Sequence, residues 1–175
     1  DILEHNNINS DQVLIVDADT IIHPDCPNFF EETNHEYSAV LNNGCYEWVT
    51  RSVRDWGNAL FPNEPLIKTY NYINTGFIIA NQKHKPFFDS LKELYLDRGE
   101  EIKVWRDKIK ASTGQTIVNF MLQKYNIKTT ILSEAYNLQD LFKKSLLHIP
   151  GHSWFSDELH YLNAGWIYHF NAIPQ

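Results

Sequence analysis

The sequence of 175 residues has no long hydrophobic run, few cysteines and little positive charge. No stretch approaches the roughly 18 or more apolar residues of a transmembrane helix, so we expect no membrane segment in the chain. Asp1–Gln12 lacks the basic and apolar regions of a signal peptide, and we interpret Asp1 as a cut N-terminus. Cys26 and Cys45 are too few for a disulfide framework and form no CxxC pair. We therefore expect a reducing, cytoplasmic compartment.

The charge balance argues against a nucleic-acid partner. The chain carries 15 Lys and Arg against 22 Asp and Glu, a formal net charge of −7. A protein that neutralises many phosphates needs a basic face, whereas Lys143 and Lys144 are the only adjacent basic pair here. With 43% hydrophobic and 21% charged residues, the composition is that of a globular chain. We assign residues 1–175 to a single domain.

Apolar runs bounded by turn residues predict short strands along the whole chain. The predicted strands are Val13–Val16, Tyr37–Leu41, Tyr72–Asn81, Ile127–Leu132 and Trp166–Phe170. The first is continuously apolar, so we expect it to be fully buried and parallel to its neighbour. The turn residues Asn42–Gly44 predict a hairpin that returns through Cys45–Thr50.

Helical spacing of apolar residues predicts helices between these strands. The predicted helices are Ser52–Leu60, Pro86–Tyr95, Thr113–Asn126 and Asn137–Leu147. The charged stretch Asp97–Lys110 is expected to be a solvated helix or loop without chemistry of its own. Because strands and helices alternate, we predict an α/β domain with a central mixed sheet, in which ligands gather at the carboxyl ends of the strands.

Two acids, Asp17 and Asp19, follow the first predicted strand and concentrate negative charge at its end. A hard divalent cation such as Mg²⁺ or Mn²⁺ relieves this repulsion and keeps open positions for phosphate oxygens. The same acids also fit a simpler role, which is to cap the turn after the strand. A second polar site, Asn74–Gly76, interrupts an apolar strand, and its glycine indicates a bulge or a close approach to the backbone. We predict that Asn74–Gly76 faces the same cleft as Asp17.

Four segments, taken in order, resemble the nucleotide-sugar glycosyltransferases of the GT-A fold. They are Val13–Thr20, Tyr72–Asn81, Gly114–Asn119 and Ile167–Asn171. The resemblance is closest to family 8, the group that includes glycogenin and bacterial galactosyltransferases. It implies a GT-A-like mixed sheet flanked by helices and a hexosyltransferase-like activity. The implied donor is a nucleotide-diphosphate sugar such as a UDP-sugar, and the acceptor is a saccharide, a lipid or a protein.

The resemblance also implies roles for individual residues. The implied ligands of a divalent metal, Mn²⁺ first and Mg²⁺ second, are Asp17, Asp19 and His169. The implied donor-binding residues are Asp17, Ala18, Asp19 and Gly76. The implied catalytic residues, at the sugar site, are Gln115 and Asn74.

The resemblance covers only part of a transferase. Proteins of the GT-A fold place a βαβ nucleotide-binding segment before the two acids, and such a unit needs about 30 or more residues. Twelve residues precede Val13 here, so we expect a truncated domain that transfers sugar poorly by itself. Two other functions remain open: a haloacid-dehalogenase-like phosphatase with Asp17 as nucleophile and Asp19 as general acid, and a degenerate carbohydrate-binding domain without turnover.

Overall fold

The computed structural model describes residues 5–139 and 165–171. Its strands are β1 (Val13–Val16), β2 (Thr20–Ile22), β3 (Tyr37–Leu41), β4 (Ile73–Ala80), β5 (Thr129–Leu132) and β6 (Ile167–His169). Its helices are α2 (Tyr46–Leu60), α3 (Lys85–Ile109) and α4 (Gly114–Lys124). Short 3-10 turns are η1 (Phe29–Glu32), η2 (Thr69–Asn71), η3 (Gln82–His84) and η4 (Glu134–Tyr136).

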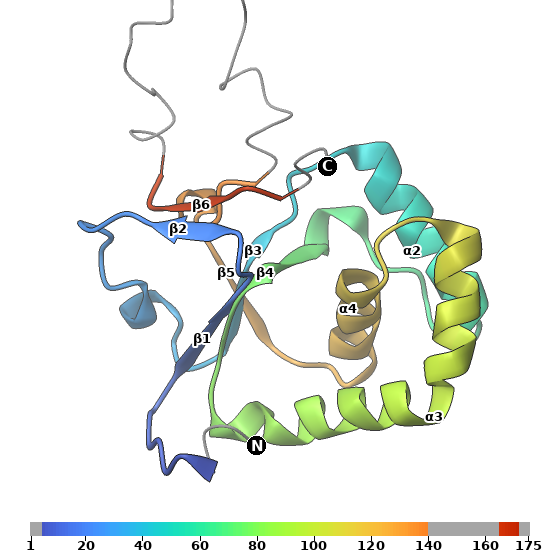
Figure 1. The fold of residues 1–175 in the computed structure, drawn as a ribbon, viewed down its shortest axis with the longest axis horizontal. Helices are drawn as coiled ribbons and strands as arrows, with labels where there is room; N and C mark the ends of the chain where they lie inside the picture. Colours follow the sequence, from blue (N-terminus) through green and yellow to red (C-terminus); the bar gives the residue numbers. More distant parts are fainter. Residues whose placement is uncertain (1–4, 140–164, 172–175) are drawn as a thin grey trace, which may run out of the picture.

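The described strands form two sheets. The larger has the order β1-β4-β3-β5, in which β4 is antiparallel to both neighbours and β5 is parallel to β3. The smaller pairs β2 with β6 in antiparallel register, Thr20 opposite His169. Figure 1 shows this two-stranded sheet across one end of the larger sheet, with the three helices together to one side. The prediction of a mixed sheet in an α/β arrangement is confirmed.

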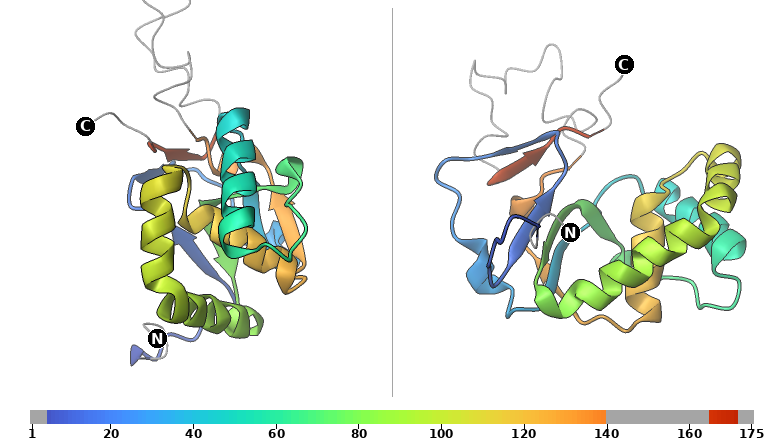
Figure 2. Two further views of the ribbon diagram at one scale, coloured as in Figure 1. Left: turned by 90° about the vertical axis from the view of Figure 1, so that its right-hand side faces the viewer. Right: turned by 60° about the horizontal axis from the view of Figure 1, so that its bottom comes forward.

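The larger sheet has a hydrophobic core on each face. Figure 2 shows the ribbon of helices α2, α3 and α4 gathered on one side of this sheet. On one face, Ile78 belongs to a core with residues of α2, α3 and α4, among them the fully buried Trp56. On the other face, Phe77 and Ile79 pack with residues of η1, η4, β5 and β6. Strand β4 is therefore a central strand packed on both faces, so its backbone position is well defined.

Strand β1 differs from the sequence prediction in its direction and burial. It runs antiparallel to β4, and within the described part of the chain β4 is its only partner, so it lies at the sheet edge. Leu14 and Val16 pack on the core, but Ile15, on the opposite face, is 45% exposed. The prediction of a fully buried parallel strand was wrong because an apolar run does not specify which element covers each face.

Helix α2 replaces the predicted hairpin, which was also wrong. It begins at Tyr46 rather than Ser52, and its buried residues Val49, Val53 and Trp56 recur at spacings of four and three. This helical period starts inside the segment assigned to the returning strand, and burial of that apolar face outweighs the turn signal of the preceding residues. Strand β3 pairs with β4 and β5 instead of with a returning hairpin strand.

The remaining helix predictions are largely confirmed. Helix α3 includes both the predicted Pro86–Tyr95 helix and most of the charged stretch, with non-helical dihedral angles at Arg98. Helix α4 matches the predicted Thr113–Asn126 helix to within a few residues. Of the predicted helix over 137–147, residues 137–139 are not helical, and Leu138 forms a bridge to Tyr168. Residues 140–147 lie outside the described residues.

Candidate metal centre

The two acids lie in the tight turn that joins β1 to β2. Asp17 continues the pairing of β1 with β4 by donating its backbone N–H to the carbonyl of Gly76 at 3.0 Å. Thr20 Oγ1 donates to the Asp17 carbonyl at 2.7 Å and closes the turn. The two carboxylate side chains are 58% and 48% exposed. They therefore share one side of the turn while keeping access to solvent.

His169 ends β6 and comes from the far end of the described chain. Pairing with Thr20 places it beside the turn, and Phe170 N donates to the Asp19 carbonyl at 2.9 Å. The side chain is 3% exposed. Its Nε2 lies 3.4 Å from Asp17 Oδ2 and 3.2 Å from Asp19 Oδ1. The structure thus brings together the three residues expected to bind metal.

We call Asp17, Asp19 and His169 the acid–histidine cluster. One ligand atom from each lies within 4.8 Å of the other two. Carboxylate and imidazole together suit a cation such as Mn²⁺, whereas Mg²⁺ prefers oxygen ligands alone. The exposed carboxylates leave room for further ligands of a cation. The buried imidazole directs Nε2 toward the two carboxylates. The donor set therefore fits a divalent cation.

The state of the second ring nitrogen of His169 bears on which nitrogen can bind a cation. Its Nδ1 is buried and has no hydrogen-bond partner among the residues that the structure describes. Histidines that bind metal through Nε2 usually donate the Nδ1 proton to a neighbouring acceptor, and the described residues supply none for His169. The arrangement leaves Nε2 as the nitrogen available to a cation.

Gly76, which the resemblance implies as a donor-binding residue, lies against the acid–histidine cluster. A Cβ atom added to it would lie 2.4 Å from His169 Cε1 and 2.7 Å from Asp17 Oδ2. Real Cβ atoms do not come that close to other heavy atoms. Only glycine permits these two side chains to meet over the β4 backbone. The sequence-based expectation of a close approach at Asn74–Gly76 is confirmed, and a register shift between Ala39 and Val40 of β3 marks the bulge.

Asn74 is on the same side of the sheet as Asp17, since both approach the position of a Cβ on Gly76. Its side chain is buried and held by the protein. Asn74 Oδ1 accepts from Gly76 N at 2.8 Å and from Asn137 Nδ2 at 3.1 Å. Asn74 Nδ2 donates to Gln139 Oε1 at 3.0 Å. The side-chain amide of Asn74 therefore helps to fix the backbone of the bulge at Gly76.

Gln115 and Ala18 are the remaining predicted residues. Gln115 lies in the first turn of α4 and accepts a hydrogen bond from Thr75 N at 3.2 Å. Its Nε2 is buried and lacks a partner within residues 5–139 and 165–171. Ala18 is exposed between the two acids. Gln115 therefore contacts the bulge of β4 next to Gly76, and Ala18 marks the open side of the turn.

Sequence reasoning missed Asn137 and Gln139, which are both fully buried. With Asn74 they form what we call the amide cluster. Gln139 also donates from Nε2 to the carbonyl of Leu41 in β3 at 2.9 Å. The alternation of apolar and polar residues from Tyr136 to Gln139 is the signal that favours an extended segment here over a helix.

Tyr136 anchors the segment just before the amide cluster. Its hydroxyl donates to Glu32 Oε1 at 2.5 Å. This hydrogen bond, together with burial and the Glu32 charge, raises the pKa of Tyr136 to about 12. The phenol therefore stays protonated at neutral pH and keeps η4 tied to η1.

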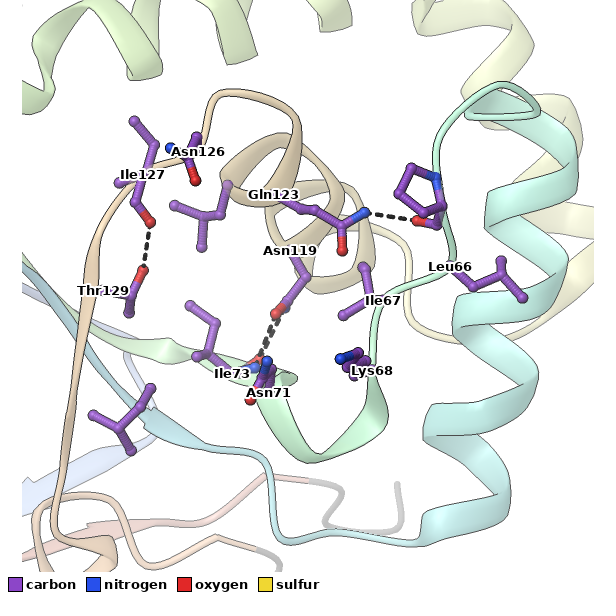
Figure 3. A pocket seen from close by; sticks show the side chains of 13 residues that line it. Leu66, Ile67, Lys68, Asn71, Ile73, Asn119, Gln123, Asn126, Ile127 and Thr129 are labelled. Atoms are coloured by element: carbon purple, nitrogen blue, oxygen red, sulfur yellow. Dashed lines mark hydrogen bonds between the residues drawn. The ribbon is translucent and has the colours of Figure 1, made fainter.

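A groove of about 530 Å³ lies apart from the acid–histidine cluster, between α4, β5 and the chain before η2 (Figure 3). Its walls include Leu66, Ile67 and Ile127. Asn119 also lines it and bonds to β4, accepting from Ile73 N at 2.9 Å and donating to Ile73 O at 3.0 Å. No residue predicted to bind metal, donor or sugar lines this groove.

Within the described residues, no helix has both the length and the hydrophobicity needed to cross a membrane. Cys26 and Cys45 are both free thiols.

No protein-family model and no curated protein matches the chain. Two solved structures are similar over 99% of it, each with 14% sequence identity. One is the glycosyltransferase GlyE of Streptococcus pneumoniae TIGR4, with a TM-score of 0.48. The other is mouse xyloside xylosyltransferase 1 in its apo form, with a TM-score of 0.46. The chain spans 36% of the first protein's length and 63% of the second's.

Proposed function

We propose that this chain is part of a glycosyltransferase that moves a sugar from a nucleotide-diphosphate donor, such as a UDP-sugar, to a saccharide, lipid or protein acceptor. The observation that carries the proposal is the meeting of Asp17, Asp19 and His169, with ligand atoms within 4.8 Å of one another. The order of motifs along the sequence implied these ligands, and the geometry supports that interpretation.

In this proposal Asp17, Asp19 and His169 hold a divalent cation, with Mn²⁺ favoured because an imidazole is among the ligands. When bound, the cation stabilises the negative charge that grows on the diphosphate as the anomeric C–O bond breaks. The side chains contribute by position. The turn between β1 and β2 fixes the backbone of the two acids, and β6 positions the imidazole, so the three ligands lie together before a donor binds.

Gln115 and Asn74 complete the proposed sugar site. Gln115 Oε1 is held by Thr75 N and its Nε2 is buried, so in this proposal Gln115 acts on the sugar site through the backbone of the β4 bulge. Asn74 acts indirectly, because its Oδ1 accepts a hydrogen bond from Gly76 N and so fixes the backbone next to the metal ligands. Ala18 and Gly76 contribute through their backbone and small size, because a larger side chain at either position would narrow the approach of the diphosphate.

The test is turnover by the complete protein that contains this chain. It is incubated with Mn²⁺ and a panel of nucleotide sugars, and the released nucleotide is measured for the wild type and for Asp19→Ala. We expect release with one donor and a loss of at least about 100-fold in the variant, as for removal of one group that stabilises transition-state charge. A full rate by Asp19→Ala would contradict the metal site.

Two further outcomes bear on the proposal. We expect the 175 residues alone to be orders of magnitude slower, because imprecise positioning of a donor costs rate steeply. An equal rate would show that the chain needs no additional segment. Release of phosphate from p-nitrophenyl phosphate, with no turnover of any nucleotide sugar, would instead favour a phosphatase.

A further inference from the structure

Gly76 couples the amide cluster to both kinds of metal ligand. Asn74 Oδ1 holds the Gly76 N–H at 2.8 Å, and the Gly76 carbonyl accepts from Asp17 N at 3.0 Å. The Cα of Gly76 also lies directly against the ring of His169, as the 2.4 Å separation of an added Cβ from Cε1 shows. Any shift of Gly76 therefore moves Asp17 and changes the space for His169.

The amide cluster also reaches His169 along a second path, through the backbone of Leu138. Leu138 N donates to Ile167 O at 2.9 Å, and His169 N donates to Leu138 O at 2.9 Å. Leu138 stands between Asn137 and Gln139, whose side chains are fastened to Asn74. Asn137 and Gln139 therefore fix the position of Leu138, and the backbone of Leu138 is hydrogen-bonded to β6.

Stability alone does not account for three amides in this position. A buried hydrogen bond contributes only about 0.5–1.5 kcal/mol, and replacing both partners by apolar groups of the same shape is often neutral. Such networks do restrict neighbouring groups to one arrangement. Here the amide cluster restricts how far the β1–β2 turn, which carries Asp17 and Asp19, lies from β6, which carries His169.

We propose that Asn137 is a positioning residue of the metal centre. Its side chain bonds to Asn74, which holds the β4 bulge at Gly76 beside Asp17. Its neighbour Leu138 accepts a hydrogen bond from the backbone N–H of His169 and so positions that residue. The inference rests on the proposed function, because it assigns Asn137 to the same cation site. Loss of a group bonded directly to a metal ligand typically lowers metal affinity by about 10–100-fold, and Asn137 acts one step further out, through Asn74 and Gly76, so we expect the lower end of that range.

The test compares Asn137→Ala with wild type in Mn²⁺ affinity, measured from the electron paramagnetic resonance signal of free Mn²⁺. We expect the dissociation constant to rise about 10-fold. Gln139→Leu, which nearly keeps the side-chain volume, is a second variant in case Asn137→Ala folds poorly. We expect it to weaken Mn²⁺ binding as well, because Asn74 Nδ2 then loses its acceptor.

Asn119→Ala is the matched control. Asn119 is another buried amide that fastens β4, but it bonds to the backbone of Ile73 and Gln115 and not to the 137–139 segment. It should lower the urea midpoint about as much as Asn137→Ala and leave Mn²⁺ affinity unchanged. Equal Mn²⁺ affinities in wild type, Asn137→Ala and Asn119→Ala, or equal losses in Asn119→Ala and Asn137→Ala, would overturn the positioning role.

A second readout separates this inference from the proposed function. The ¹⁵N spectrum of the His169 imidazole in metal-free protein reports whether Nε2 keeps its contact with the carboxylates. We expect Asn137→Ala to change it and Asn119→Ala to leave it as in wild type. If wild type binds no Mn²⁺, the proposed metal site fails, yet a changed His169 spectrum still supports the positioning role. An unchanged spectrum in Asn137→Ala overturns that role whatever Mn²⁺ does.

Discussion

At the scale of single residues, Gly76 is the tightest point of the candidate site. Gly76→Ala would place a methyl group 2.4 Å from His169 Cε1 and 2.7 Å from Asp17 Oδ2. The ring and the carboxylate must then separate by about 1 Å to reach ordinary contact distances. We expect Mn²⁺ affinity to fall at least about 10-fold, as for other disturbances of ligand orientation. Titration of Mn²⁺ into both proteins measures this.

The control for this substitution is Gly114→Ala, at the start of α4. There the nearest neighbour of an added Cβ is Tyr95 Oη at 3.8 Å, so the methyl group fits. Mn²⁺ affinity should equal that of wild type. If Gly76→Ala binds Mn²⁺ as tightly as Gly114→Ala does, the backbone of β4 is not the wall against which the ligands are packed.

The members of the acid–histidine cluster were predicted from the sequence on two different grounds. Asp17 and Asp19 follow an apolar run, whereas His169 was implied only by the resemblance of the ordered motifs to glycosyltransferases. Asn137 was not predictable, since its partner Asn74 is far away along the chain. No local pattern distinguishes an amide that joins two segments from one that faces solvent. That distinction depends on burial, which only the folded chain decides.

At the scale of elements, η3 joins β4 to α3 through His84. Its Nδ1 accepts from Asn81 N at 3.1 Å, while Asn81 Oδ1 accepts from Lys83 N. The buried ring also meets Tyr37 edge-on. Burial, followed by the charge of Lys83, lowers the pKa of His84 against the opposing effect of Glu36. This junction therefore requires the neutral imidazole.

The pH dependence of stability follows from this sign. Unfolded chains protonate histidine near pH 6.5, while the fold keeps His84 neutral to lower pH. The stability it supports is present above about pH 6.5 and is lost as the pH falls toward its folded pKa, by at most about 1.4 kcal/mol per pH unit. Urea unfolding at pH 7.5, 6.5 and 5.5 should show a shallower decline in His84→Gln. Parallel curves for the two proteins would refute the assignment.

The elements were predictable in kind but not in arrangement. Apolar runs marked every described strand of the larger sheet, yet neither the order β1-β4-β3-β5 nor the direction of β1 follows from them. Pairing depends on which distant strand supplies the neighbouring edge. The predicted hairpin failed at α2 for a related reason, because the buried face formed by Val49, Val53 and Trp56 has a helical period that overrides nearby turn residues.

At the scale of the whole molecule, a cation that binds only the folded chain stabilises it. At a Mn²⁺ concentration 100 times its dissociation constant, the free energy of unfolding should rise by about 2.7 kcal/mol. Urea unfolding with and without Mn²⁺ measures the change. Asp19→Ala should show almost none, since one carboxylate ligand is gone. An equal rise in both proteins would place the stabilising Mn²⁺ elsewhere.

The position of His169 makes the centre a product of chain closure. Its partners Asp17 and Asp19 stand near the first strand, and β6 is the last described element. A two-stranded ribbon as short as β2 with β6 is marginal by itself, and loop closure between distant segments costs entropy. A chain that has formed its larger sheet but not docked β6 holds two acids and no imidazole. In the proposed metal site, a bound cation would therefore join the turn after the first described strand to the last described strand, and its binding would offset part of that entropy cost.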